Sequence, residues 1–263
     1  MYPVLIKIGS VKVYTYGFFI VIGYFSALWL ASRESRRTGY GSGHMMELSF
    51  WVMTAAVIGA RFFYIITDLQ TFIDRPADIF KIAEGGLVFY GSFAGGLVAA
   101  LIYLKKMELP IAKIFDMVTP CLPLAHFFGR IGCFFAGCCY GRKCDLTWAV
   151  SFNHPETMAP KEILLHPVQL YSAAGNLAIF TVIWFLRDKK KFDGQLFFTY
   201  VITYGFFRIF VEFFRDDFRG PVLFGAFSVS QAIGIGLSLS AAIGLFLASK
   251  KRTRFGNQKE HHA

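Results

Sequence analysis

Long apolar runs separated by short charged loops dominate the chain. Seven runs can be drawn, at about residues 14–31, 46–66, 86–104, 114–128, 166–187, 194–214 and 227–248. A helix needs about 20 apolar residues to cross a bilayer core, and in lipid only helices and closed barrels satisfy their own backbone hydrogen bonds. The pattern therefore predicts an all-α membrane protein, folded as a bundle of seven transmembrane helices.

The charged loops predict how this bundle is oriented. Lysine and arginine are concentrated after the first, third, fifth and seventh runs, as in Arg33, Arg36 and Arg37, but not after the others. Because basic loops stay in the cytoplasm, the N-terminus should lie outside and the C-terminus in the cytoplasm. We expect one membrane domain at 1–249 with an outer loop at about 140–165, and a basic, disordered cytoplasmic tail at 250–263.

Composition narrows the class of protein and its partners. Hydrophobic residues make up 55% of the chain and charged residues 17%, which is rare in a soluble domain. The net charge of +10 would suit a nucleic-acid partner, but the basic residues lie in loops between apolar runs, where membrane topology requires them. We therefore expect membrane lipid, and no nucleic acid, as a partner.

Polar residues inside the apolar runs share one predicted depth, toward the outer ends of the helices. They are Arg61, Tyr90, Arg130, His166, Gln169, Arg208 and Glu212. An arginine beside a hydrocarbon core is costly and suggests function, and its planar fork can hold a phosphate through two parallel bonds. The alternative is an arginine that snorkels to the lipid headgroups. The shared depth favours a ligand from the outer leaflet over a transport substrate, which would bind near the midplane.

The sixth run carries a polar helix face. Tyr204, Arg208, Glu212 and Arg215 are spaced four, four and three residues apart, so they lie on one side of a helix. Glu212 can pair with Arg208 and orient its guanidinium group. One carboxylate cannot neutralise several arginines, so the site should stay electropositive and bind an anion. The alternative is a self-satisfied ion pair that locks the bundle.

Cysteines cluster beside Arg130. The chain has Cys121, Cys133, Cys138, Cys139 and Cys144, and the last four follow the spacing C-x4-C-C-x4-C. This spacing is not a standard zinc or iron–sulfur pattern, so we expect no metal. On an oxidising outer face disulfides are favoured, and catalytic thiols or a metal site are the weaker alternatives.

Several ordered motifs, covering nearly the whole chain, resemble those of the prolipoprotein diacylglyceryl transferase family. They are Tyr16-Gly17, Gly59-Ala-Arg61, Gly85-Gly86, Tyr90-Gly91, Gly129-Arg130-Ile-Gly132, Gly141-Arg142, His166-Pro-Val-Gln-Leu-Tyr171, and the Tyr204–Arg215 face with Arg208 and Glu212. The chain departs from the usual signature at four positions. Cys133 and Ala136 stand where the family has asparagine, Cys138 where it has glutamate, and Tyr90 where many members have histidine.

The resemblance implies a multi-pass enzyme of the bacterial inner (plasma) membrane that needs no cofactor. It would transfer the diacylglyceryl group of phosphatidylglycerol to the lipobox cysteine of a prolipoprotein, forming a thioether and releasing glycerol phosphate. It implies catalytic roles for Arg130, Arg208, Tyr90 and His166. It implies headgroup binding by Arg130, Arg61, Arg208, Glu212, Tyr16 and Tyr204. Tyr90 would orient the phosphate or the thiolate, and His166 is the rival base because histidine exchanges protons near neutral pH.

An alternative from another class is a lipid- or anion-binding membrane protein with redox-active or disulfide-bonded cysteines and no transfer activity. A single outer-leaflet cavity that opens sideways to lipid would favour the transferase.

Overall fold

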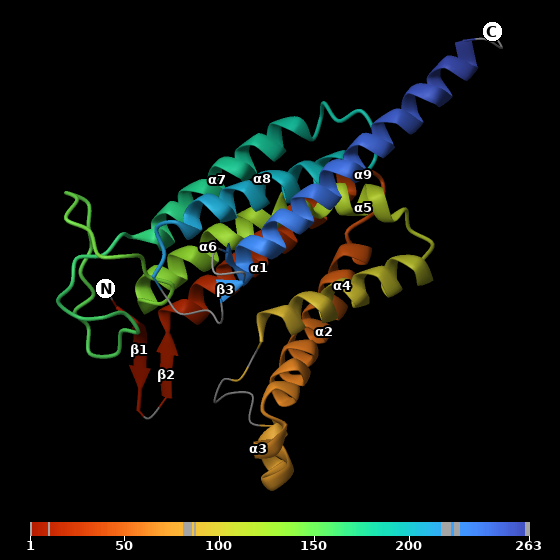
Figure 1. Cartoon of the computed structure of the whole chain (residues 1–263). Coiled ribbons are helices and arrows are strands. Elements are labelled where there is room, and N and C mark those ends of the chain that lie inside the picture. Colours follow the sequence, from red (N-terminus) through yellow and green to blue (C-terminus); the bar gives the residue numbers. More distant parts are fainter. Residues whose placement is uncertain are drawn as a thin grey trace. The chain divides into compact units, whose positions relative to one another are not determined.

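The computed structural model of the protein is mostly helical (Figure 1). It describes residues 2–9, 11–80, 86, 88–216, 222–223 and 227–260. In chain order the elements are β1 (Val4–Ile8), β2 (Val11–Tyr14), α1 (Thr15–Arg37), α2 (Gly43–Thr67), α3 (Leu69–Asp74), the 3-10 helix η1 (Pro76–Phe80), α4 (Phe89–Lys106), α5 (Ile111–Val118), α6 (Cys121–Ala136), α7 (Val168–Leu186), α8 (Gln195–Glu212), β3 (Val222–Leu223), β4 (Phe227–Ser228) and α9 (Val229–Glu260).

The chain divides into two compact units. The larger unit consists of Met1–Trp29 and Phe115–Ala263, and the smaller unit of Leu30–Ile114. Helix α1 therefore begins in the larger unit and ends in the smaller one. The expectation of a single membrane domain at 1–249 stays a prediction.

Five helical stretches of the described residues are long and apolar enough to cross a membrane. They are Thr15–Arg37, Gly43–Thr67, Ile111–Ala136, Val168–Leu186 and Gln231–Lys250. These stretches support the predicted class, a helical membrane protein. Helices α4 and α8 coincide with two further expected spans, but α4 ends in Lys105 and Lys106 and α8 contains Arg208 and Glu212. The count of seven transmembrane helices stays a prediction.

The fourth apolar run differs from its expected form. The sequence predicts one helix over 114–128, but the structure has α5 and α6 with a break at Thr119 and Pro120. Proline has no backbone N–H with which to continue the hydrogen bonds of α5, which explains the break. Helix α6 then continues through Arg130 to Ala136, so Gly129 and Gly132 on either side of Arg130 are helical. The chain turns only at Gly137, whose φ of 73° is the left-handed conformation that often ends helices.

The N-terminal end of the chain departs from the helical pattern, and the C-terminal helix runs further than the apolar run predicts. Strands β1 and β2 pair antiparallel before α1, and Gly9 between them has a φ of 60°, which glycine adopts at low steric cost. The alternation Val11-Lys-Val-Tyr14 is typical of a strand, a signal that the search for long apolar runs passes over. At the other end α9 continues to Glu260, and residues 261–263 lie outside the described residues. The expectation of a disordered tail at 250–263 stays a prediction.

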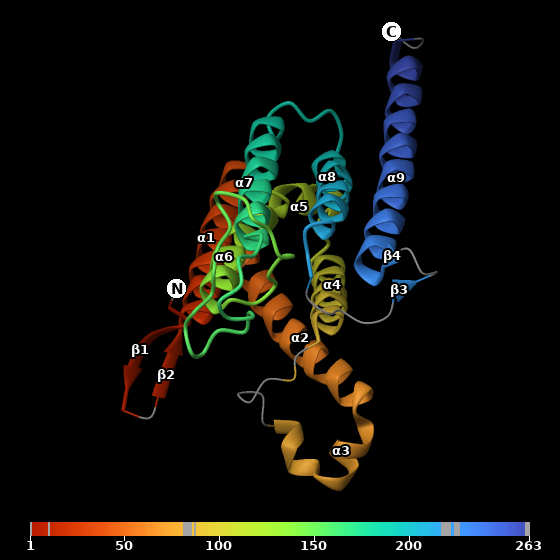
Figure 2. The ribbon, with the colours of Figure 1, turned by 60° about the vertical axis from the view of Figure 1, so that its left-hand side comes forward.

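Helices of the larger unit pack in series, α6 against α7, α7 against α8, and α8 against α9 (Figures 1 and 2). Helix α1 contacts α6 at Gly132, where a Cβ would lie 3.1 Å from Phe19 Cβ and 3.2 Å from the Tyr16 carbonyl oxygen. The rings of Phe19 and Phe135 stack with centroids 5.5 Å apart. These contacts hold the part of α6 that carries Arg130 against the start of α1.

Asp116 of α5 anchors the start of α8. Its buried carboxylate accepts hydrogen bonds from the backbone N–H groups of Gly194 at 2.9 Å and Phe197 at 3.1 Å, and from Lys190 Nζ at 2.9 Å. The first N–H groups of a helix have no partner within it and carry partial positive charge, so a carboxylate stabilises them. The contact fixes the end of α8 that is remote from Arg208.

The smaller unit is built on close packing of α2 against α4. A Cβ at Gly91 would lie 2.2 Å from the Gly59 carbonyl oxygen, and one at Gly95 would lie 2.4 Å from the Ala55 carbonyl oxygen. The backbones therefore approach so closely that only glycine fits. The sequence-based expectation that Gly91 and Gly95 mediate helix packing is confirmed.

The connection from α6 to α7 folds over a small apolar core of its own. Phe152, Ala159 and Leu165 are buried there, and three partly buried side chains pack against them: Phe134, Tyr140 and Val150. Isolated bridges join Lys143 and Val150 to Leu165. This local structure positions the residues that lead from the end of α6 to the start of α7.

Candidate active site

A small cavity lies between α6, α7 and α8 of the larger unit. Its lining consists of Arg130, Ser172, Asn176, Tyr204, Phe207, Arg208, Val211 and Arg215. Arg130 is also within electrostatic range of Tyr204 and Arg215. Three guanidinium groups thus border one space, and like charges at short range repel unless an anion or a carboxylate lies between them.

Glu212 pairs with Arg208 one helical turn away, and each side chain is only 13% exposed. The predicted ion pair is therefore confirmed. It orients the Arg208 guanidinium group, which also lines the cavity. The residues that line the cavity include three arginines and no aspartate or glutamate, so the lining itself is electropositive, as the spacing on α8 predicts.

Helix α7 contributes two lining residues that the sequence analysis missed. Ser172 and Asn176 are both buried, and Asn176 Nδ2 donates a hydrogen bond to the Ser172 carbonyl oxygen at 2.7 Å. With Gln169 they form a polar stripe at spacings of three and four residues on an otherwise apolar helix. That stripe is a sequence signal for a buried polar face, although we considered only Gln169.

Aromatic and imidazole rings extend the cavity wall. The ring of Tyr204 stacks on Tyr200 with centroids 5.6 Å apart and lies 5.3 Å from the ring of His126. The side chains of His126 and Asn176 also interact. His126 begins the glycine- and cysteine-rich segment 126–142. No pattern along the chain singles it out, because its neighbours come from α7 and α8.

The turn that follows α6 is held from three sides. A Cβ at Gly137 would lie 2.0 Å from Thr157 Oγ1, so only glycine fits there. Gln169 Nε2 donates a hydrogen bond to the Cys138 carbonyl oxygen at 2.8 Å. Arg142 donates from its backbone N–H to the Phe214 carbonyl oxygen at 2.9 Å and from Nε to the Arg215 carbonyl oxygen at 3.1 Å. The turn is thereby tied to the residues at the end of α8.

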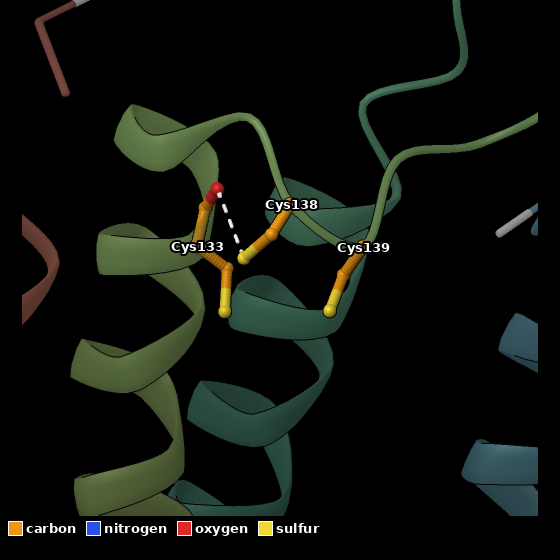
Figure 3. A group of neighbouring side chains, drawn as sticks. All are labelled: Cys133, Cys138 and Cys139. Atoms are coloured by element: carbon orange, nitrogen blue, oxygen red, sulfur yellow. Dashed lines mark hydrogen bonds between the residues drawn. The ribbon is translucent and has the colours of Figure 1, made fainter. Parts of the chain in front are cut away.

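This turn brings three cysteines together (Figure 3). The sulfur atoms of Cys133, Cys138 and Cys139 all lie within 4.8 Å of one another, and Cys138 Sγ contacts the Cys133 carbonyl oxygen at 3.8 Å. All five cysteines lie among the described residues and none forms a disulfide, although the sequence favours disulfides here. Hydrogen bonding by Cys133 and Cys138 lowers the pKa of the Cys139 thiol, and the charges of Arg215 and Arg130 act in the same direction.

Comparison with known proteins identifies the family. The family model for prolipoprotein diacylglyceryl transferase matches residues 3–247. This chain belongs to the prolipoprotein diacylglyceryl transferase family. It is 38% identical to a phosphatidylglycerol–prolipoprotein diacylglyceryl transferase of Clostridium tetani over 97% of this chain and 99% of the relative.

Two further relatives of the family carry the same name. The chain is 34% identical to phosphatidylglycerol–prolipoprotein diacylglyceryl transferase 2 of Clostridium perfringens, over 88% of this chain and 90% of the relative. It is 31% identical to the transferase of Ectopseudomonas mendocina, over 95% of this chain and 94% of the relative. The likeness therefore extends over nearly the full length of these proteins.

Besides Glu212, two residues to which the family resemblance assigned roles lie in the larger unit outside the cavity lining. Tyr16 of α1 is within electrostatic range of Arg130 and of the three clustered cysteines. His166, just before α7, has its Nδ1 atom 3.2 Å from the Tyr171 hydroxyl group, and its ring lies 5.4 Å from that of Phe214. Tyr16 thus lies beside the site, and His166 belongs to an aromatic cluster next to it.

Arg61 and Tyr90, the other two such residues, lie in the smaller unit. The Arg61 guanidinium group is buried and donates to the carbonyl oxygens of Ile79 at 3.0 Å, Gly86 at 3.2 Å, and Asp78. These bonds hold the segment before α4 on the end of α2. Tyr90 is 45% exposed in the first turn of α4. Headgroup binding by Arg61 and catalysis by Tyr90 stay predictions for this member of the diacylglyceryl transferase family.

Proposed function

We propose that this protein transfers the diacylglyceryl group of phosphatidylglycerol to the lipobox cysteine of prolipoproteins, the first step of bacterial lipoprotein maturation. The observation that carries the proposal is the cavity bordered by Arg130, Arg208 and Arg215 in a member of the diacylglyceryl transferase family. Arginine forks match phosphate oxygens, and phosphatidylglycerol carries its negative charge on a phosphate.

The reaction is a displacement at carbon. The lipobox sulfur attacks the glyceryl carbon that bears the phosphate, a carbon–sulfur bond forms, and the carbon–oxygen bond breaks. Its electron pair leaves on the oxygen of glycerol phosphate, so negative charge grows on the leaving group. Arg130 and Arg208, held in place before the reaction begins, stabilise that charge. Glu212 keeps Arg208 oriented, and Tyr204 lines the same cavity as Arg208.

The attacking thiol must lose its proton, because the thiolate is the nucleophile and a free cysteine has a pKa of about 8.5. The positive charges around the cavity favour the thiolate of a bound lipobox cysteine. Tyr90 would orient the phosphate or thiolate through its hydroxyl group, with His166 as the rival base. The family resemblance also implies headgroup binding by Arg61 and Tyr16.

The predicted membrane orientation would put this chemistry in the outer leaflet. On the positive-inside rule, a bundle of seven transmembrane helices has its N-terminus outside and its C-terminus in the cytoplasm. Arg130 and Arg208 then lie at the outer side of the bacterial inner membrane, where phosphatidylglycerol and the lipobox of an exported precursor meet. The enzyme would act on these two partners and on no nucleic acid.

The test uses the purified full chain with phosphatidylglycerol and a lipobox peptide. We expect a mass gain of one diacylglyceryl group on the peptide cysteine and release of glycerol phosphate. A peptide with serine in place of the cysteine is the matched control and should gain no mass. Lipid binding without mass gain on the cysteine peptide would support the alternative, a non-enzymatic lipid- or anion-binding protein with redox-active or disulfide-bonded cysteines.

A further inference from the structure

Three thiols that the reaction as described does not use converge beside the cavity. Cys133 lies in the last turn of α6, and Cys138 and Cys139 follow in the turn after that helix, with all three sulfur atoms within 4.8 Å of one another (Figure 3). Cys133 is buried, and the other two are half-buried. The cluster is therefore shielded from water in part but is not fully buried.

The backbone is arranged to bring these sulfurs together. Cys139 has a φ of 60°, a left-handed conformation that is uncommon for residues other than glycine, asparagine and aspartate. Such a conformation is costly and persists where surrounding contacts enforce it, often at functional sites. Here the buried Gln169 holds the carbonyl oxygen of the preceding residue, Cys138.

We propose that Cys133, Cys138 and Cys139 bind one zinc ion, and that its open fourth position takes the thiolate of the lipobox cysteine. This inference rests on the proposed transferase function. The proposal departs from the sequence-based expectation of no metal. That expectation arose because the spacing of the cysteines along the chain does not resemble known zinc motifs, whereas the positions of their sulfur atoms in space fit a zinc ion.

Coordination geometry supports zinc. With Zn–S bonds of about 2.3 Å, three sulfurs on one tetrahedral zinc ion lie about 3.8 Å apart. The observed limit of 4.8 Å is within about 1 Å of that spacing, a shift that side-chain rotation can supply. A disulfide would join two of the three sulfurs and leave the third unused. Three protein ligands with one position open is the usual arrangement of a zinc ion that binds substrate.

The charges around the cluster fit the same assignment. Three thiolates and one zinc ion carry a net charge of about −1, and a bound lipobox thiolate brings it to about −2. Arg215 and Arg130 are both within electrostatic range of Cys139, so two positive charges offset the negative charge of the zinc–thiolate cluster. The same two arginines line the cavity proposed for the phosphate, which places a zinc-bound sulfur next to the headgroup.

Zinc would serve the reaction by activating the thiol. A thiol that coordinates zinc is deprotonated, and its proton passes to water when the lipobox cysteine binds. The zinc-bound sulfur then attacks the glyceryl carbon, the carbon–oxygen bond breaks, and glycerol phosphate leaves with the electron pair. The thioether product has no negative charge and is a weaker zinc ligand, so it can be released. No electron donor or acceptor is needed.

The first experiment measures metal content. The full chain, purified in reducing buffer with zinc and freed of loose metal, should retain about one zinc ion per chain. Cys139→Ser and Cys133→Ser should each weaken zinc binding by more than the roughly 10- to 100-fold typical of losing an outer-shell partner. Cys144→Ser is the matched control, because Cys144 lies outside the cluster, and it should retain both zinc and transfer activity. A shared thermal unfolding midpoint shows that the variants are folded.

The second experiment asks whether the substrate sulfur joins the metal. When cobalt replaces zinc, its bonds to thiolates should give an absorption band in the near ultraviolet. This band should strengthen when the lipobox peptide is added and should not change with the control peptide that has serine in place of the cysteine. Protein stripped with a chelator should lose at least about 100-fold in transfer rate at neutral pH, the scale of a lost catalytic proton transfer, and regain it with zinc. These results would support the assignment.

Other outcomes would overturn it. Folded and active protein without zinc, an active protein with a disulfide between two of the three cysteines, or zinc whose removal leaves transfer unchanged would each remove zinc from the mechanism while leaving the transferase function intact. Conversely, cobalt spectra that respond to the cysteine peptide in protein without transfer activity would support the metal site and refute the transferase function, so the two failures are distinguishable.

Discussion

Gln169 on α7 donates a hydrogen bond to the carbonyl oxygen of Cys138 at 2.8 Å, across the contact between α7 and the turn after α6. Gln169 is 1% exposed, so the bond is shielded from water. It couples the first turn of α7 to the residues that present the three sulfur atoms.

Replacing Gln169 by leucine should therefore both destabilise the protein and reduce transfer. A part-buried carbonyl oxygen that loses its partner costs up to about 1–3 kcal/mol of folding free energy, and the turn would lose this tether to α7. Thermal unfolding in detergent and transfer by the remaining folded protein measure the two effects. Thr181→Val on an exposed face of the same helix is the control. Unchanged stability in Gln169→Leu would show that the turn is held by other contacts.

Arg208→Ala should abolish measurable transfer while the protein still inserts into the membrane. The expected loss is at least about 100-fold, the scale of removing one preorganised charge donor from a transition state, and Arg130→Ala should behave alike. Arg208→Lys should restore little, because an ammonium group is a point charge and not a planar fork. Arg36→Ala, an exposed change at the end of α1, is the matched control. Near-normal turnover of folded Arg208→Ala would remove this arginine from the mechanism.

Tyr90→Phe and His166→Gln separate two accounts of thiol activation. If activation is electrostatic or by metal, His166→Gln should keep the pH dependence of the rate. Tyr90→Phe should then lose about ten- to a hundredfold, the worth of one charge-assisted hydrogen bond of about 1.5–3 kcal/mol. The position of His166 in an aromatic cluster, outside the cavity lining, favours this outcome. If the pH–rate profile of the wild type has a limb near pH 6–7 and this limb is lost in His166→Gln, His166 is the base.

Gly91→Ala should destabilise the smaller unit. A Cβ at this position would lie 2.2 Å from the Gly59 carbonyl oxygen, so α2 and α4 must separate, at a cost of about 1–3 kcal/mol in folding free energy. Gly236→Ala in α9 is the control, because no atom lies within 4 Å of the position that its Cβ would take. Its melting temperature should stay at or slightly above that of the wild type. Equal melting temperatures of the two variants would contradict the packing argument.

Lys190 should contribute stability that depends on pH. Burial opposes its charge, but the hydrogen bonds to Asp193 and Asp116 outweigh burial and raise its pKa above the ordinary value of 10.5. A raised pKa means that the folded protein holds this proton more tightly than the unfolded chain. The stabilisation is therefore complete below about pH 10.5 and is lost as the pH rises through the raised pKa.

The free energy of unfolding of the wild type and of Lys190→Met, measured at several pH values, checks the direction of this pH dependence. At about pH 9 the variant should be less stable by about 1–2 kcal/mol, since one hydrogen-bonded charge beside the buried Asp116 is missing. The difference should shrink as the pH rises beyond the raised pKa. Lys189→Met removes the same charge from an exposed neighbour and should show little difference at either pH. A difference in unfolding free energy between the wild type and Lys190→Met that grows as the pH rises would refute the argument.

The sequence alone determined the helical membrane class, most of the helix positions, and the polar face of α8. These features depend on neighbours along the chain. An apolar run long enough for a bilayer must satisfy its backbone hydrogen bonds as a helix, and a spacing of four residues places Arg208 beside Glu212 whatever surrounds them. The spacing of the glycines in α4 likewise predicted a close helix contact, and α2 supplies the partner.

Tertiary structure decided which residues meet. Ser172 and Asn176 join Arg130 and Arg208 at one cavity only because α6, α7 and α8 pack together. The three sulfurs converge because α6 continues to Ala136 and Gln169 holds the turn beyond it, a relationship between residues far apart in the chain. Arg61 is likewise bound to three carbonyl oxygens that follow it by many residues. Such contacts depend on how helices pack, and periodicity along one segment carries no information about its neighbour across the bundle.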